Sequence, residues 1–132
     1  MIEKLFQNLK SFAEREPVIR AIVLIGSFAR GTAGPQSDVD LVVIASKPEK
    51  LLNDRDWVEQ FGEACSCVLE DYSLVQSLRV FYKNGMEVEF GITSLDWIAE
   101  TELKSTGKIL SGGYRVIYDP GNLIDAFFGR VE

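Results

Sequence analysis

The stretch that most constrains the fold is DVDLVVIA, residues 38–45, in which two aspartates lead directly into an apolar run. The run from residue 41 to residue 44 is rich in β-branched side chains and predicts a buried strand. Residues i and i+2 of a strand share one face, so the carboxylates of Asp38 and Asp40 are expected side by side at its start. Two close carboxylates repel each other, and burial adds a desolvation cost. A cation, a cluster of hydrogen-bond donors or open water must therefore lie in front of the pair.

The chain before this strand predicts a helix and another strand. Apolar residues recur at helical spacing from residue 2 to residue 13, and Pro17 ends the pattern. VIRAIVLIG, residues 18–26, has the β-branched composition of a strand, which Gly26 ends. After the aspartate-led strand, Pro48 is expected in a loop.

SLRVFYKNGMEVEFGI, residues 77–92, is the clearest local pattern in the chain. Asn84 and Gly85 lie between two alternating runs, which favours a type I′ turn and therefore a β-hairpin. Alternation assigns Met86, Val88 and Phe90 to one face of the hairpin and Glu87 and Glu89 to the other. The preceding stretch, residues 66–76, is ambiguous.

Helical patterns flank the hairpin on both sides. A helix is expected to begin after Asp54 or Asp56, with an apolar stripe made of Trp57, Phe61, Ala64 and Cys65. After the hairpin, Thr93 and Asp96 have the spacing of a capping box, which predicts a helix over about residues 94–104.

The end of the chain predicts one more strand and one more helix. YRVIYD, residues 114–119, is expected to form a short strand. Asp119 as N-cap and Pro120 as first helical residue then open a helix that carries Leu123, Ile124, Phe127 and Phe128. These elements together predict one α/β (α+β) domain over residues 1–132, with a mixed β-sheet flanked by helices.

Composition excludes several kinds of site. The chain contains no histidine, which removes Ser-His-Asp and Cys-His catalysis and leaves acid-base or metal chemistry to carboxylates. Cys65 and Cys67 form a lone CxC motif, too few thiols for a four-cysteine zinc site, and are expected to be structural. The formal charge of −6 disfavours long DNA or RNA as a partner, although a bound divalent ion could reverse the field locally.

The sequence predicts neither export nor membrane insertion. Residues 1–17 intersperse charges among their apolar positions and lack the continuous apolar stretch of a signal peptide. Apolar runs such as AIVLI at residues 21–25 are far too short to cross a membrane. A soluble cytoplasmic protein is therefore expected.

Gly26 and Ser27 lie at a predicted strand-to-helix transition. A glycine there lets another group approach the backbone, and the free N–H groups at a helix start attract an anion such as phosphate. The simpler interpretation is that the two residues only end the strand and cap a short helix. GSFARG is not a P-loop, because the GK[ST] ending is absent.

Carboxylates supply the second part of a candidate site. Asp38 and Asp40 need no partner if they merely flank an exposed strand entrance, but Asp40 directly precedes the buried run. Two or three carboxylates without imidazole suit Mg²⁺. Glu89 offers a third carboxylate, although it could equally be an ordinary exposed hairpin residue, and Glu87, expected to be solvated, could replace it. Three carboxylates beside a phosphate site would hold two metal ions, as in phosphoryl or nucleotidyl transfer.

GS at residues 26–27, ARG at 29–31 and SDVDL at 37–41 resemble the GSxARG…SDxDL signature of the nucleotidyltransferase superfamily that includes DNA polymerase beta. The similarity is strongest over residues 18–44 and continues more weakly to VEF at residues 88–90. By position, the resemblance implies a set of metal-binding and catalytic residues, which are Asp38, Asp40 and Glu89. It likewise implies a set of nucleotide-binding residues, which are Gly26, Ser27, Arg30 and Ser37. Arg30 could neutralise phosphate charge, and a structural salt bridge is equally compatible with it.

The resemblance implies a Mg²⁺-dependent nucleotidyltransferase, with two ions and an NTP bound. The enzyme would transfer a nucleoside monophosphate, expected to be AMP, to a hydroxyl of a small molecule or a protein. NGMEVEFGI and GGYRVIYDPGN also resemble aminoglycoside adenylyltransferases, and relatives of that kind carry a C-terminal helical domain that helps bind the acceptor. Small stand-alone relatives often work with a separate helical partner, in some cases as antitoxins that nucleotidylate a HEPN toxin. A helical partner or a homodimer is therefore expected, and the alternative is a catalytically silent nucleotide-binding module.

Overall fold

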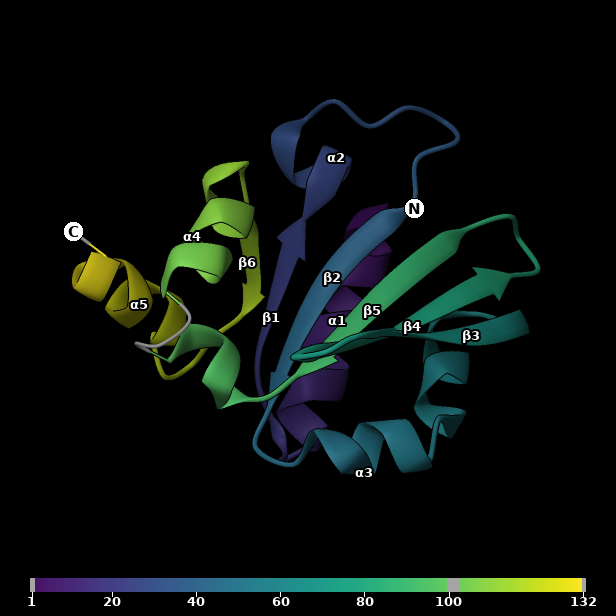
Figure 1. The fold of residues 1–132 in the computed structure, drawn as a ribbon. Helices are drawn as coiled ribbons and strands as arrows, with labels where there is room; N and C mark the ends of the chain where they lie inside the picture. Colours follow the sequence, from purple (N-terminus) through teal and green to yellow (C-terminus); the bar gives the residue numbers. More distant parts are fainter. Residues whose placement is uncertain (1, 100–102, 132) are drawn as a thin grey trace.

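A six-stranded sheet forms the centre of the molecule, which we describe from a computed structural model covering residues 2–99 and 103–131 (Figure 1). Its strands are β1 (Ile19–Ile25), β2 (Val39–Ala45), β3 (Ala64–Tyr72), β4 (Val75–Tyr82), β5 (Glu87–Thr93) and β6 (Arg115–Tyr118). Their order in the sheet is β3-β4-β5-β2-β1-β6. The pairing of β2 with β5 is parallel and the other pairings are antiparallel. The structure confirms the predicted α/β fold with a mixed sheet.

Helices pack on both faces of this sheet. They are α1 (Ile2–Arg15), α2 (Gly26–Arg30), α3 (Pro48–Asn53), α4 (Leu103–Ser111) and α5 (Leu123–Val131), with 3₁₀ helices η1 (Asp56–Phe61) and η2 (Leu95–Ile98). Figure 1 shows α1 behind the sheet and α4 and α5 beside β6 and β1. The apolar stripe of α1 that the sequence predicted is buried, as expected of an amphipathic helix on a sheet.

The larger core lies between the sheet and α1, α3 and η1. It includes alternate residues of the central strands, such as Leu41, Val43, Val88 and Phe90. An aromatic group joins the two layers: the ring centroids of Phe12 and Trp57 lie 5.5 Å apart, and those of Trp57 and Phe90 lie 4.9 Å apart. Aromatic pairs of this kind add about 1 kcal/mol each beyond the area that they bury. This packing holds the central strands in place on the face of the sheet that α1 covers.

The opposite face of the sheet is divided into two halves. A smaller core covers β1 and β2 with residues of η2, α4 and α5, among them Trp97, Leu110, Ile124 and Phe127. On β4 and β5 the same face presents polar side chains, which are Ser77, Arg79, Glu87 and Glu89. The apolar residues that alternate with them point into the larger core. The candidate site lies on this polar half.

The stretch between β2 and β3 differs from the sequence-based expectation. Pro48 does not lie in a loop, because it begins α3, where its missing N–H costs no hydrogen bond. The helix expected through Cys65 ends much earlier: η1 ends at Phe61, Gly62 adopts a φ of +149°, and Ala64 begins β3. A side chain on Gly62 would lie 2.9 Å from the Tyr82 ring. The ambiguous residues 66–76 form most of the β3–β4 hairpin.

The predicted β4–β5 hairpin is confirmed, but its turn is not type I′. A type I′ turn needs a positive φ at both central residues, and Asn84 is not among the residues with positive φ, whereas Gly85 has a φ of +91°. The Gly85 N–H donates to Tyr82 O at 2.9 Å, and the Tyr82 N–H donates to Met86 O at 2.8 Å. The loop therefore contains three residues, 83–85, and ends in a left-handed glycine.

The stretch after β5 differs in part from the predicted helix. Thr93 ends β5 and donates its hydroxyl to Leu74 O at 2.7 Å, so it caps no helix. Ser94 caps the short η2 by accepting the Asp96 N–H at 3.2 Å. Part of the helix expected over 94–104 falls on residues 100–102, outside the described ranges, and the described part of α4 covers Leu103–Ser111.

The last helix is capped from a distance. The Asp119 carboxylate accepts the N–H groups of Leu123 and Ile124 at 2.9 and 3.0 Å, so its capping role holds although α5 begins at Leu123 and not at Pro120. The side chain of Phe128 lies outside the described part of the chain.

Two further expectations concern the thiols and the membrane. Cys65 is exposed, whereas Cys67 packs partly against the larger core, where burial raises the pKa of its thiol. Only Cys67 therefore fits the expected structural role. Within the described ranges, no helix combines the length and the apolar character that crossing a bilayer requires.

Candidate functional site

Parallel pairing of β2 with β5 brings three carboxylates together. The register places Asp40 beside Glu89, while the neighbouring pair Val39 and Val88 is buried on the opposite face. Asp38, Asp40 and Glu89 each offer a carboxylate oxygen within 4.8 Å of the other two. We call these three residues the carboxylate triad. The two aspartates and the hairpin glutamate that the sequence singled out thus share one site.

Gly26 allows Asp40 to reach this position. The register of β1 with β2 sets Ile25 opposite Asp40, and Gly26 follows with a φ of +76°. A Cβ on Gly26 would overlap the Oδ2 atom of Asp40 and lie 3.2 Å from its Cβ and Cγ atoms. The start of α2, with Ser27 next along the chain, therefore lies against the triad. Only glycine satisfies both the backbone conformation and the close approach.

The electrostatics of the triad answer the question raised by the paired aspartates. Burial raises the pKa of Asp40 to about 7, with further contributions from the negative charges of Asp38 and Glu89. At neutral pH a proton or a cation must therefore accompany Asp40. Since the donor set consists of carboxylate oxygens alone, it fits a hard divalent ion such as Mg²⁺.

Arg79 is a site residue that sequence reasoning missed. From β4 its guanidinium donates to four carboxylates, those of Glu87 at 2.5 Å, Glu70 at 2.9 Å, Glu89 at 3.0 Å and Asp38 at 3.3 Å. The hydrogen bonds that Arg79 donates to Glu87 and Glu70 raise its pKa above its already high value, so the group stays charged. Two of its four acceptors belong to the triad.

Glu89 is held by two donors, and Glu87 by one. The Ser77 hydroxyl donates to Glu89 Oε1 at 2.9 Å, and Arg79 donates to Glu89 Oε2 at 3.0 Å. Glu87 is bound to Arg79 instead of being solvated as the sequence suggested, and it is not a member of the triad. Glu89 is thus the hairpin glutamate that faces the aspartates.

The hairpin pattern contained enough information to find Arg79. Leu78, Val80 and Tyr82 on one strand and Val88 and Phe90 on the other can share a buried face only if the loop holds an odd number of residues. A two-residue loop would place a residue of the apolar set opposite Glu89. The three-residue loop places Arg79 opposite Glu89 instead.

Ser37 and Arg30 make contacts away from the triad. The Ser37 hydroxyl accepts the Gly34 N–H at 2.9 Å and so closes the loop before β2. Arg30 is exposed at the end of α2, and its Cγ atom lies 3.1 Å from where a Cβ of Gly113 would be. Neither contact assigns these residues to nucleotide binding, so that role remains a prediction.

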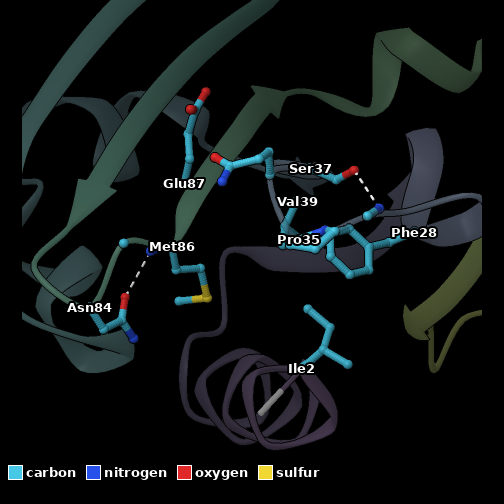
Figure 2. A pocket seen from close by; sticks show the side chains of 11 residues that line it. Ile2, Phe28, Pro35, Ser37, Val39, Asn84, Met86 and Glu87 are labelled. Carbon is cyan, nitrogen blue, oxygen red and sulfur yellow. Dashed lines mark hydrogen bonds between the residues drawn. The ribbon is translucent and has the colours of Figure 1, made fainter.

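Ser37 lines a cavity of about 540 Å³ at the starts of the central strands β2 and β5. The cavity lies between the loop before β2, the start of α1 and the β4–β5 loop (Figure 2). Figure 2 shows Ile2, Met86 and Phe28 around it, while the Glu87 carboxylate points away from Ile2. Its walls are largely apolar at Ile2, Phe28, Val39 and Met86, and the triad residues do not line it.

A second cavity, of about 410 Å³, adjoins the triad on the polar half of the sheet. Asp40, Ser77 and Glu89 form its polar wall, and its apolar wall includes Tyr72, Val75, Trp97 and Ile109. Gly91 lines it too, where a Cβ would lie 3.0 Å from Leu41 O and 3.1 Å from Val75 Cγ1. We call this cavity the triad pocket.

Comparison of the sequence with known families agrees with this geometry. The family described as nucleotidyltransferase domain matches residues 5–89, which include the whole triad and Gly26. A curated protein of Methanocaldococcus jannaschii, named "Putative protein adenylyltransferase", is 33% identical over 115 residues, or 85% of this chain and 67% of the relative.

Solved structures with the same fold include two enzymes of nucleotidyl transfer. An aminoglycoside 6-adenyltransferase from Bacillus subtilis matches 77% of this chain with a TM-score of 0.56 and 15% identity. A CCA-adding enzyme in its apo form matches 94% of this chain with a TM-score of 0.51 and 16% identity. The chain spans only 36% and 32% of those two structures, and at this identity the likeness concerns the fold. The family match over residues 5–89 and the relative at 33% identity establish that the chain belongs to the nucleotidyltransferase domain family, a family of transferases.

Proposed function

We propose that this protein transfers AMP from ATP to a hydroxyl group of a protein acceptor, in a Mg²⁺-dependent reaction that releases pyrophosphate. The observation that carries the proposal is the carboxylate triad, whose Asp40 lies directly against Gly26 at the start of α2. Membership of the nucleotidyltransferase family supports the reaction class. The name of the Methanocaldococcus jannaschii relative supports AMP as the group transferred and a protein as the acceptor.

The triad would hold the metal ions, and its third member would also move a proton. Asp38, Asp40 and Glu89 offer oxygens within a span that suits two neighbouring divalent ions. Bound Mg²⁺ would offset the charge of the triphosphate and stabilise the attacking and leaving oxygens. Glu89 would accept the proton of the acceptor hydroxyl at a carboxylate oxygen, as the hydroxyl oxygen bonds to the α-phosphorus and the bond to the pyrophosphate oxygen breaks.

Gly26 and Ser27 are proposed to bind the triphosphate. Gly26 has no side chain to shield its backbone N–H, and the first N–H groups of α2 have no side-chain cap and can meet an anion. Arg30, one turn later and exposed, is available to reach a phosphate. Ser37 is proposed to act indirectly, by fixing the loop that leads into Asp38.

The triad pocket is the proposed entry for the acceptor. It opens on the polar half of the sheet and reaches Glu89, the proposed base. Its remaining wall is apolar and includes two aromatic residues, Tyr72 and Trp97, which suits a side chain with an apolar body and a terminal hydroxyl. A helical partner protein or a second copy of the chain would present such a side chain.

Transfer of label tests the proposal directly. Purified protein is incubated with α-³²P-labelled ATP, CTP, GTP or UTP, with Mg²⁺ or EDTA, and with proteins encoded beside its gene as candidate acceptors. We expect Mg²⁺-dependent labelling of an acceptor from ATP, and loss of at least about 99% of it in Asp40→Asn, since a metal ligand is removed. NTP binding without transfer to any acceptor would instead favour a catalytically silent module.

A further inference from the structure

The guanidinium of Arg79 bonds to two of the three residues that the proposed function assigns to metal. It donates to Oδ2 of Asp38 and to Oε2 of Glu89, and its other contacts go to Glu70 and Glu87, outside the triad. The Arg79 side chain is 24% exposed, less than a freely solvated arginine, and its charge is fixed. The positively charged guanidinium of Arg79 therefore lies at the edge of the proposed metal site.

The four contacts are not equivalent. Arg79 lies closest to Glu87 and Glu70, at 2.5 and 2.9 Å, and its contact with Asp38 is the longest, at 3.3 Å. Glu87 and Glu70 can therefore hold the guanidinium in place when the Asp38 carboxylate binds a divalent metal ion instead. Glu89 receives Ser77 at one oxygen and Arg79 at the other, so its carboxylate plane is fixed from both sides.

We infer that Arg79 is a positioning residue of the metal site, which holds Glu89 toward the two aspartates and competes with divalent metal for Asp38 and Glu89. The inference rests on the proposed function, because it takes the triad as the metal ligands. A positive charge a few ångströms from the triad weakens its attraction for a second cation. The same contacts keep the carboxylates in place. The side chains therefore lose less conformational entropy when metal binds.

A merely structural ion-pair role makes a different prediction. If Arg79 only stabilised the hairpin, its loss would lower the stability of the fold and would not strengthen metal binding. If Arg79 competes with metal, removal of its charge strengthens metal binding even as transfer slows, because Glu89 loses one of its two donors. Metal affinity therefore separates the two roles without any need for turnover.

The test titrates Mn²⁺ into protein without nucleotide and follows free Mn²⁺ by electron paramagnetic resonance. We compare the native protein with Arg79→Met, which keeps the apolar stem, and with Arg79→Lys, which keeps the charge. Arg115→Met is the matched control, because it removes an arginine that is paired with Glu3 and half exposed. We expect the Kd to fall about tenfold or more in Arg79→Met and to change less than about threefold in Arg79→Lys and Arg115→Met.

Arg79→Met removes one donor from each of four carboxylates and could fail to fold. The double variant Arg79→Met/Glu87→Gln removes one of these charges, and circular dichroism verifies its fold. It too should bind Mn²⁺ more tightly than the native protein. A Kd equal to or weaker than native in whichever variant folds would overturn the role of Arg79.

The outcome also separates this inference from the proposed function. Native protein that shows no saturable Mn²⁺ binding, or binding that Asp40→Asn leaves unchanged, would contradict the assignment of the triad. Native binding that Asp40→Asn weakens, without tightening in the Arg79 variants, would contradict only the role of Arg79. With an acceptor in hand, Arg79→Met should also reach half-maximal rate at a lower Mg²⁺ concentration, with a lower maximal rate.

Discussion

The backbone of Gly26, at the end of β1, lies against the carboxylate of Asp40 on β2, a proposed metal ligand. Gly26→Ala should destabilise the protein by about 2–3 kcal/mol, since alanine is strained at a φ of +76° and its Cβ would overlap the Asp40 carboxylate. Gly31→Ala is the matched control, because Gly31 has the same φ and nothing within 4 Å of an added Cβ; it should cost about 1 kcal/mol. Urea unfolding of both variants measures the difference. Equal losses of stability in the two variants would mean that the Asp40 side chain can move away from the added methyl group at no cost in free energy.

The raised pKa of Asp40 makes the stability of the fold depend on pH. An unfolded aspartate titrates near 3.9 and folded Asp40 near 7, so between these values the native state binds more protons than the unfolded state. The free energy of unfolding therefore falls as pH rises through this window. The Asp40→Asn variant does not lose stability in this way. In EDTA its free energy of unfolding should equal that of the native protein near pH 4 and exceed it by about 1 kcal/mol at pH 8. A native protein that gains stability relative to the variant as pH rises would contradict the shift.

Glu89 and Glu87 lie two residues apart but should differ in function. Glu89→Gln should lower transfer by about 100-fold or more, because a metal ligand and proton acceptor is lost. Glu87→Gln removes only a contact of Arg79 and should cost less than about tenfold. Glu63→Gln, on an exposed residue paired with Lys83, is the control. A larger loss in Glu87→Gln than in Glu89→Gln would assign the third carboxylate to Glu87.

At the scale of elements, the β4–β5 hairpin shows which of two sequence cues sets the register. The Asn84-Gly85 pair favours a two-residue loop, whereas the alternating apolar residues require an odd loop length. Deletion of Lys83 would leave Asn84 and Gly85 as a two-residue loop with Tyr82 still opposite Met86, so the apolar residues would keep their buried face and stability should change by less than about 1 kcal/mol. Lys83→Ala removes only an exposed ion pair and should change stability by less than about 0.5 kcal/mol. A loss of more than about 3 kcal/mol in the deletion variant would show that the three-residue loop itself, and not the burial pattern, holds the register.

Strands could be predicted from the sequence because burial determines them locally, whereas the members of the triad were predicted from the paired aspartates and from the family resemblance that extends to VEF at residues 88–90. The apolar runs of β1 and β2, and the alternation along β4 and β5, are visible without knowledge of their partners. Helix boundaries were less predictable: the start of α5 depends on the Asp119 side chain reaching back from an earlier loop, and the end of η1 depends on Gly62 packing against Tyr82. The hairpin register alone pairs Arg79 with Glu89, but the contact of Arg79 with Asp38 also requires the β2–β5 register, which the sequence does not reveal.

At the scale of the whole molecule, the net charge and the exposed apolar surface around the triad pocket influence how substrates approach. The chain carries a formal charge of −6, and five carboxylates, from Asp38, Asp40, Glu70, Glu87 and Glu89, gather around Arg79 on one face. A triphosphate alone would be repelled by such a surface, so the nucleotide is expected to bind only when metal ions are present. Around the triad pocket, Tyr72 and Ile109 are 56% and 44% exposed, an apolar rim that an acceptor protein could cover.

Joint binding of metal and nucleotide predicts how the thermal stability of the whole molecule responds. A ligand that binds only the folded state stabilises it by about 2.7 kcal/mol at a hundredfold excess over its Kd. ATP with Mg²⁺ should therefore raise the Tm by several degrees, whereas ATP with EDTA should leave it almost unchanged, because the triad and the triphosphate repel each other without the ions. Asp40→Asn should respond weakly to ATP with Mg²⁺ although its own Tm at pH 8 is the higher of the two. An equal rise with EDTA would mean that the nucleotide binds elsewhere, and the absence of a rise with any NTP at millimolar concentration would contradict nucleotide binding at the start of α2.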